Sequence, residues 1–346
     1  MDIAVDFEKP LLELENRNEE LENYTGNKGI NLNTVTEMLE NNVTAYTGDG
    51  ICTPWERIRL VRHAGRPNVL DYIKMLFTDF LPLAGDRLVG EDPAIAGGIG
   101  RFEEISVTVF GHVKGHNTKE NLARNFGMAH PEGFRKCLRL ARQAAKFHRP
   151  VISFIDTPGA CFSIDAEEHG QAWAIASNLY AFSQIRTPII TVITGECCSV
   201  GALALGIGDA LLMFENAVCS VVSPERCAAD LWNDLERAPE AAAALKMTAP
   251  ELLRLKLIDS IILEPKGGAH LDPQETANTL RQELRKVLQV LRRLDPETLI
   301  DLRWNRLCSI RGIKAMNNEL VMRVCKLGVS CEQTWDLDQQ VAKFSG

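Results

Sequence analysis

Two segments of the chain share one order of features, and this order limits the folds that the chain can adopt. Each segment begins with a short apolar run rich in β-branched residues, PVISFID at 150–156 and TPIITVIT at 187–194. Each run leads into a turn that contains glycine and then into a stretch with helical patterning. Short apolar strands that alternate with helices are typical of a buried parallel sheet. The sequence therefore predicts an α/β fold.

Neighbouring segments extend this core. The runs AIAGGIGRF at 94–102 and ISVTVFGHVKG at 105–115 predict a pair of strands. A helical pattern follows over 118–148, and residues 210–232 predict two more strands, a turn and another helix. We expect the core to span residues 91–270.

The two ends of the chain are predicted to be helical. Residues 6–23 carry apolar side chains at helical spacing among many charges, which indicates an amphipathic helix that packs on the body or on a partner. Thr53, Pro54 and Glu56 form the pattern of a capped helix start, and residues 273–294 predict a long charged helix. We therefore expect three parts: an N-terminal helical arm with further helices at 1–90, the core at 91–270, and a C-terminal helical region with a tail at 271–346.

Composition disfavours several classes of protein. The formal net charge of -8 disfavours a nucleic-acid partner. An acidic N-terminus without a run of about 18 apolar residues predicts no signal peptide and no membrane span, so the expected location is the cytoplasm. The 10 cysteines form no C-x-x-C pair, so we expect no metal site and mostly buried, reduced thiols.

Two glycine-containing turns are candidates for a functional site. DTPGA at 156–160 and TGECCSVGALALG at 194–206 both join a predicted strand to a predicted helix. Such a junction points unpaired backbone N–H groups and the positive end of a helix dipole at one place, which favours an anion or a developing oxyanion. Gly195 and Gly201 would let a substrate approach the backbone closely, although glycines at such junctions also serve tight packing.

Cys197 and Cys198 lie within the second turn, and more than one role is open to them. They can be side chains tolerated beside a backbone site, or one of them can be a nucleophile, because a helix N-terminus lowers the pKa of a thiol. The base would then be a histidine such as His112, His116 or His169. Adjacent cysteines chelate one metal poorly. Ser199 lacks the preceding glycine that a nucleophile elbow needs.

Long motifs around these turns resemble one family. They are DTPGA…AEE.GQ, GE..S.GALALG.GD, SVVSPE.CA..LW and LKLIDSII.EP.GGAH, with LAGDRLVGEDPAIAGGIGR and GHVKGHNTKENLARNFGMAHPEGFRKCLRLA upstream. Over roughly residues 5–310 the chain is similar to the carboxyltransferase α subunit of the multi-subunit bacterial and plastid acetyl-CoA carboxylase. The resemblance implies a crotonase-like, ClpP-like ββα superhelix, and it adds the plastid stroma as a second possible location.

The resemblance also implies a reaction and partners. A carboxyl group moves from carboxybiotin, held on a separate biotin carrier protein, to acetyl-CoA or another acyl thioester. The amides of Val200 and Gly201 would stabilise negative charge on the biotin ureido oxygen, while a β-like subunit would supply the enolate side. The remaining residues expected to bind substrate are Gly159, Ala160, Cys161, Gly195, Cys197, Cys198, Lys114, His112 and Arg124. The last three could attract a carboxylate or phosphate, or could be solvated or salt-bridged.

The chain departs from the pattern of this family in both turns. A turn that contains Tyr-Pro-Gly is replaced by Cys161 and the residues after it, and glycines are replaced by Cys197, Cys198 and Val200. These changes suggest a specialised paralogue that acts on another acyl thioester. They are also compatible with a non-catalytic partner of a β-like chain, or with a thiol-dependent acyl enzyme that uses Cys197 or Cys198.

Overall fold

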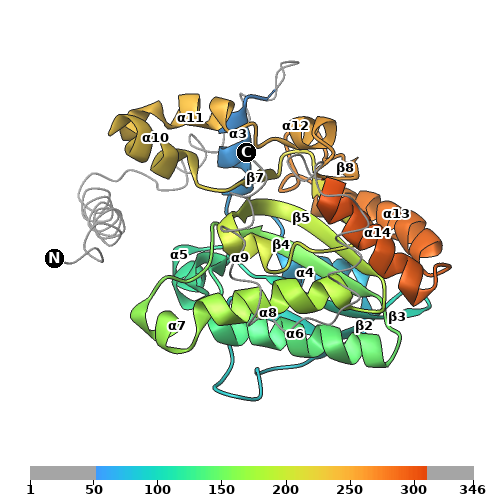
Figure 1. The fold of residues 1–346 in the computed structure, drawn as a ribbon. Coiled ribbons are helices and arrows are strands. Elements are labelled where there is room, and N and C mark those ends of the chain that lie inside the picture. The colour runs from blue at the N-terminus through green and yellow to red at the C-terminus, as the bar shows by residue number, and fades with distance from the viewer. Residues whose placement is uncertain (1–51, 310–346) are drawn as a thin grey trace, which may run out of the picture.

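A mixed β-sheet lies at the centre of the computed structural model, which describes residues 52–309 (Figure 1). Its strands in this range are β1 (Thr78–Pro82), β2 (Ile95–Phe102), β3 (Ile105–His112), β4 (Val151–Thr157), β5 (Ile189–Cys198), β6 (Ala210–Phe214), β7 (Val218–Ser220) and β8 (Ser260–Ile262). Their order is β1-β2-β3-β4-β5-β6-β8, and β7 pairs with β5. The first three strands are antiparallel and the others run parallel, which confirms the predicted α/β fold.

The two strands that lead to the glycine turns are the most buried part of the sheet. Every residue of β4 and β5 is buried, as expected for β-branched and apolar runs covered on both faces. β5 pairs with β6 as far as Ile193 and with β7 from Glu196 onward. Gly195 lies at this change of partner, where a Cβ would be 2.3 Å from Asp156 Oδ1. The missing side chain therefore makes room for the Asp156 carboxylate.

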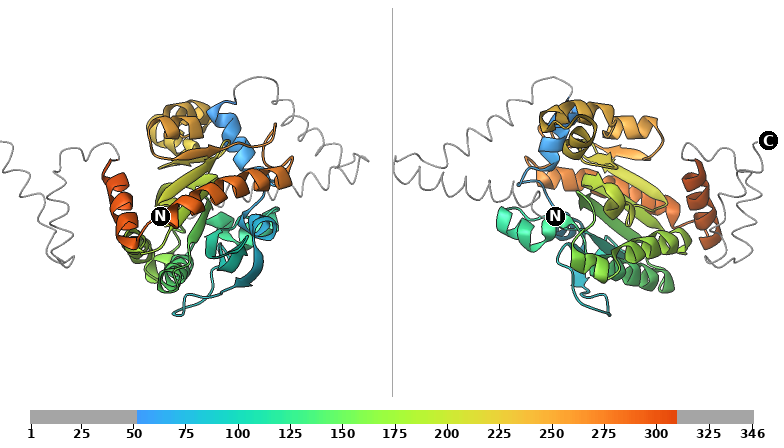
Figure 2. Two further views of the ribbon diagram at one scale, coloured as in Figure 1. Left: turned by 90° about the vertical axis from the view of Figure 1, so that its right-hand side faces the viewer. Right: turned by 60° about the vertical axis from the view of Figure 1, so that its left-hand side comes forward.

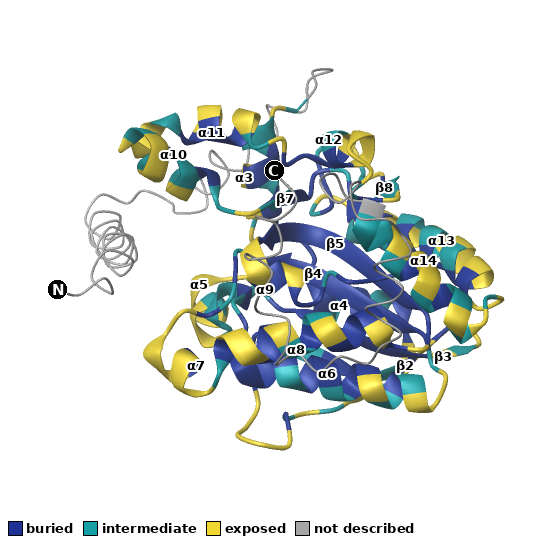
Figure 3. Ribbon diagram, viewed as in Figure 1, coloured by how far each residue is buried: buried dark blue, intermediate teal, exposed yellow. Residues whose placement is uncertain are grey.

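Helices cover both faces of the sheet. α6 (Pro131–Lys146) contacts α8 (Gln171–Gln184) and the strands β2 and β3, and these two helices lie in front of the sheet in Figure 1. α4 (Val69–Leu76) and α13 (Pro273–Leu291) contact each other, and α4 lies behind the sheet. The side of α6 and of α8 that faces the sheet is buried, and the opposite side of each helix is exposed (Figure 3). α14 (Pro296–Ser309) contacts α8, and its Arg303 is buried in an ion pair with Asp209.

A smaller group of helices stands apart from these layers. α3 (Pro54–Val61), α10 (Pro224–Trp232) and α11 (Ala238–Ala244) pack on one another, and Figure 2 shows them together from two further sides. Thr53 and Glu56 form the predicted capping box at the start of α3. The remaining short elements are α5 (Thr118–Ala123), η1 (Asn125–Gly127), α7 (Ile164–Glu168), α9 (Ser199–Leu203), η2 (Leu235–Arg237) and α12 (Ala249–Arg254).

Some expectations about the elements are confirmed and others differ. The predicted helix at 273–294 corresponds to α13. The helical pattern over 118–148 is interrupted, because Asn125 and Phe126 have φ values of 46° and 53°, which no α-helix accommodates. One hydrophobic cluster runs from Val69 to Leu299, so it crosses both expected part boundaries, and the three-part division stays a prediction. The predicted arm at 6–23 and the tail after 309 lie outside the described residues.

Candidate functional site

The two glycine turns come together at the ends of β4 and β5. A Cβ on Gly201 would be 2.4 Å from the carbonyl carbon of Gly159 and 2.5 Å from the nitrogen of Ala160. Such distances are shorter than any real Cβ contact, so only glycine at 201 allows the two backbones to approach this closely. The structure therefore brings three of the predicted site residues into one place.

The second turn also exposes the start of a short helix. Ser199 has a φ of 60°, in the left-handed region, and this sharp bend directs the chain from β5 into α9. Val200 is 50% exposed. No side chain caps the first turn of α9 within the described residues, and first-turn N–H groups have no partner inside their own helix. Gly201 itself is buried, and the role of the Val200 and Gly201 amides as donors to an acceptor stays a prediction.

A charge network, of which Asp156 and Glu196 are buried, lies at the end of β5. Lys114 Nζ is 2.8 Å from Asp156 Oδ1 and also contacts Glu196, whose other oxygen accepts from Arg62 Nε at 2.8 Å. The amide of Glu196 donates to Asp156 Oδ1 at 2.9 Å. Burial raises the pKa of Glu196, but the charges of Lys114 and Arg62 outweigh burial and lower this pKa to about 2. Glu196 is therefore ionised and holds two cations in place.

The three basic residues expected to attract an anion lie in three different environments. The positive charge of Lys114 is shared between two carboxylates of its own chain, so it is salt-bridged. His112 is fully buried, and burial lowers its pKa to about 4, so it is neutral at pH 7. This corrects the expectation that His112 presents a cation. Arg124 Nη1 donates to the carbonyl oxygen of Pro93 at 3.0 Å, and its contact with a substrate stays a prediction.

Cys197 and Cys198 are buried and turn toward β7. The Cys197 sulfur is 2.9 Å from that of Cys219, and the Cys198 sulfur is 3.8 Å from Ser220 Oγ. The hydrogen bond with Cys219, together with burial, raises the pKa of Cys197, and burial raises the pKa of Cys198 to about 11. The expectation that a helix N-terminus lowers the pKa of these thiols is wrong, because burial outweighs that effect.

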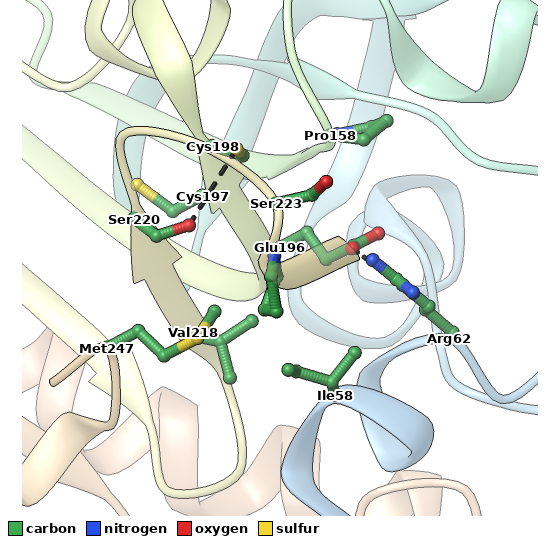
Figure 4. A pocket seen from close by; sticks show the side chains of 11 residues that line it. Ile58, Arg62, Pro158, Glu196, Cys197, Cys198, Val218, Ser220, Ser223 and Met247 are labelled. Atoms are coloured by element: carbon green, nitrogen blue, oxygen red, sulfur yellow. Dashed lines mark hydrogen bonds and ion pairs between the residues drawn. The ribbon is translucent and has the colours of Figure 1, made fainter. Parts of the chain in front are cut away.

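A recess open to solvent lies beside these two cysteines, between α3, β5 and β7 (Figure 4). The side chains that line it are Ile58, Arg62, Pro158, Glu196, Cys197, Cys198, Val218, Ser220, Ser223, Pro224 and Met247. The ion pair of Arg62 with Glu196 forms one side of the recess, and the contact of Cys198 with Ser220 forms another.

Sequence reasoning missed two features of this region. It did not anticipate that Asp156 and Glu196 hold Lys114, because residues far apart in the chain give no spacing signal. It also did not single out His130, whose ring nitrogen Nε2 is 3.3 Å from the Cys161 sulfur. The only available signal was the position of His130 directly before Pro131, where the chain enters α6.

Comparisons of the sequence with known proteins find carboxyltransferases of acetyl-CoA carboxylase. A family model described as acetyl co-enzyme A carboxylase carboxyltransferase-like matches residues 4–311. A protein of Heliobacterium modesticaldum named acetyl-coenzyme A carboxylase carboxyl transferase subunit alpha is 51% identical over 306 residues, covering 88% of this chain and 91% of that protein. A protein of the same name from Carboxydothermus hydrogenoformans is 50% identical over 303 residues, covering 87% and 94%.

A solved structure is similar at the level of the fold. The transcarboxylase 12S structure with methylmalonyl-coenzyme A and methylmalonic acid bound aligns with a TM-score of 0.54 and 18% identity, over 67% of this chain and 42% of that chain. Within residues 52–309, none of the helices is long and apolar enough to cross a bilayer.

Proposed function

The chain belongs to the acetyl co-enzyme A carboxylase carboxyltransferase-like family, and from this membership we propose that it helps to transfer a carboxyl group from carboxybiotin to acetyl-CoA, giving malonyl-CoA. It is a carboxyltransferase α subunit with the crotonase-like fold of that enzyme class. The observation that carries the proposal is the sequence identity of 51% and 50% to two relatives with this name, over most of the chain.

The residues of this chain act through their backbone. Carboxybiotin, a substrate presented by a separate carrier protein, supplies the carboxyl group. Once the carboxyl group has left, biotin can accept a proton. The N–H groups of Val200 and Gly201 donate to an oxygen that gains negative charge, and the start of α9 adds the positive end of its dipole. Preorganised donors of this kind contribute about 3 kcal/mol each in comparable oxyanion holes. No side-chain nucleophile is needed.

The close contact of the two turns fits this role. Gly201 rests on the backbone of Gly159 and Ala160, so the donors are held by main-chain packing rather than by mobile side chains. Cys197 and Cys198, which replace glycines of the family pattern, turn toward β7 and leave the amides uncapped. The network around Glu196 keeps the end of β5 rigid.

A second chain completes the site in this proposal. Large apolar side chains are exposed on α8, α9 and the segment before α8, and they are Phe162, Ile164, Trp173, Tyr180, Val200 and Leu203. Trp173 and Tyr180 are 78% and 69% exposed and lie two helical turns apart, hence on one side of α8. Exposed apolar groups around a site indicate a protein partner. We assign this face to a carboxyltransferase β-like subunit, with the biotin carrier protein as a transient partner.

Competing functions are less well supported. The burial and raised pKa values of Cys197 and Cys198 disfavour a thiol-dependent acyl enzyme at those positions. The relatives favour acetyl-CoA over another acyl thioester and an active subunit over a non-catalytic partner. Within the described residues, no hydrogen bond joins the Ser199 hydroxyl to a histidine, so a serine hydrolase has no base there.

Reconstitution tests the proposal. The full chain is mixed with the β subunit from the same source, carboxylated biotin carrier protein and acetyl-CoA, and malonyl-CoA is measured. Product that requires both chains supports the proposal, and propionyl-CoA and butyryl-CoA test acyl selectivity in parallel. If the two chains form a stable complex and yet no acyl thioester is carboxylated, the function is wrong.

A further inference from the structure

Three side chains from distant parts of the sequence meet beside the first glycine turn. Cys161 follows that turn, His130 precedes α6 and Asp92 precedes β2. The Cys161 sulfur is 3.3 Å from His130 Nε2, and His130 Nδ1 is 3.8 Å from Asp92 Oδ1. A thiol, an imidazole and a carboxylate in this order form the arrangement that activates cysteine nucleophiles.

Asp92 fixes the backbone of His130 and lies close to its imidazole ring. It is 2% exposed, and its Oδ2 accepts from the His130 amide at 2.8 Å while its Oδ1 accepts from the Ala94 amide at 2.9 Å. The neighbouring Asp92 carboxylate, and then the hydrogen bond to Cys161, raise the pKa of His130 to about 10. His130 is therefore an imidazolium at pH 7, with one nitrogen toward the carboxylate and the other toward the sulfur.

The sulfur has further hydrogen-bonding contacts and a fixed backbone. Ser163 Oγ is 3.4 Å from Cys161 Sγ. Burial raises the pKa of Cys161, but the hydrogen bonds from His130 and Ser163 outweigh burial and lower it to about 7. The Cys161 amide donates to Ala129 at 3.0 Å, and its carbonyl accepts from Gln171 Nε2 at 2.8 Å. The thiolate thus has a defined place against the imidazolium.

Access to this sulfur is restricted. Cys161 is 6% exposed, whereas about a third of the His130 side chain is exposed. The small exposed fraction of Cys161 favours a small reagent over a bulky acyl-CoA. We propose that Cys161 is a modification site that hydrogen peroxide oxidises to a sulfenic acid, with His130 as the proton donor.

The oxidation is balanced without any other reactant. The Cys161 thiolate attacks one oxygen of hydrogen peroxide, so that an S–O bond forms while the O–O bond breaks. The departing hydroxide takes the proton of His130 Nε2 and becomes water. The sulfur loses two electrons and peroxide gains them. This chemistry goes beyond carboxyl transfer and needs neither the β subunit nor biotin.

Trapping of the sulfenic acid tests the proposal on the full chain alone. The protein is treated with hydrogen peroxide and dimedone, digested, and the labelling rate of each cysteine peptide is measured by mass spectrometry. At pH 7 about half of Cys161 is thiolate, against about 1% for a thiol at the ordinary value of 9.0. The lower intrinsic nucleophilicity of a weaker base offsets about 10-fold of this advantage. We expect His130→Gln to slow labelling of Cys161 about 5-fold at pH 7.

Two controls give the test its meaning. Cys161→Ser removes the adduct from that peptide, and Cys137, fully buried with a pKa that burial raises, stays unlabelled in the folded chain. The rate for the unmodified chain is also followed from pH 5 to 9, where we expect a midpoint near 7. If His130→Gln does not fold, this pH profile decides. An unlabelled Cys161, or a midpoint near 9, overturns the proposal without bearing on carboxyl transfer.

Discussion

Replacing Gly201 with alanine places a methyl group where the backbone of the first turn now lies. The new Cβ would be 2.4 Å from the carbonyl carbon of Gly159 and 2.5 Å from its oxygen. Ordinary van der Waals contacts begin at 3.4 Å, so the two turns must separate by about 1 Å. Neither neighbour is a flexible side chain that could move aside. The strain therefore falls on the main chain that positions the amides.

The expected magnitude follows from this displacement. A misplacement of about 1 Å in a catalytic arrangement costs about 100-fold in rate. Overpacking of a tight contact costs about 1 to 3 kcal/mol in the free energy of unfolding. We expect Gly201→Ala to reduce kcat for malonyl-CoA formation about 100-fold in the reconstituted enzyme and to lower stability by about 2 kcal/mol in urea denaturation.

Gly159→Ala is the matched control. A Cβ on Gly159 would meet only the Cβ of Ser199, at 4.0 Å, and its φ lies outside the left-handed region. The same chemical change at the opposite side of the contact should therefore leave the free energy of unfolding within about 0.5 kcal/mol of the unmodified chain. Equal stability of the two variants, or a Gly201→Ala enzyme with unchanged kcat, would refute the reasoning about the packed turns.

Further predictions concern the network, the capping box and pH. Glu196→Gln removes the negative charge that forms ion pairs with both Lys114 and Arg62, and it should lower the free energy of unfolding by about 3 kcal/mol. A loss below about 0.5 kcal/mol would contradict a structural role of this network. Thr53→Ala should cost about 1 kcal/mol while Thr53→Ser costs little, and equal melting temperatures would refute this role. Burial raises the pKa of Glu264, but Arg66 lowers it to about 2. Its stabilisation is thus complete above its ordinary pKa of 4.5 and is lost as pH falls toward 2. The stability difference between the unmodified chain and Glu264→Gln should shrink over that window, and a constant difference would contradict it.

Local features of the fold could be predicted from the sequence. The start of α3 depends on Thr53, Pro54 and Glu56, which lie within one turn, so their spacing alone reveals the cap. β4 and β5 are recognisable because strands buried on both faces must be apolar along their whole length. The left-handed run that interrupts the helix over 118–148 ends at Gly127, but Phe126, with a φ of 53°, carries no such mark.

The candidate site could be predicted only in part. The two turns were found because glycine next to a strand end is visible in the sequence, and the structure brings Gly159 and Gly201 together. The state of the cysteines depends on contacts between segments far apart in the chain. Burial against β7 makes Cys197 a poor nucleophile, whereas His130, 31 residues before Cys161, makes that thiol acidic. Sequence spacing alone predicts neither environment.

The most direct measurement of the central claim is a structure of the reconstituted complex with its biotin carrier protein and CoA. The account predicts that the ureido oxygen of biotin lies about 3 Å from the N–H groups of Val200 and Gly201, with the β-like chain opposite. A biotin bound elsewhere, or N–H groups that donate to no ligand because the partner chain covers them, would contradict the account.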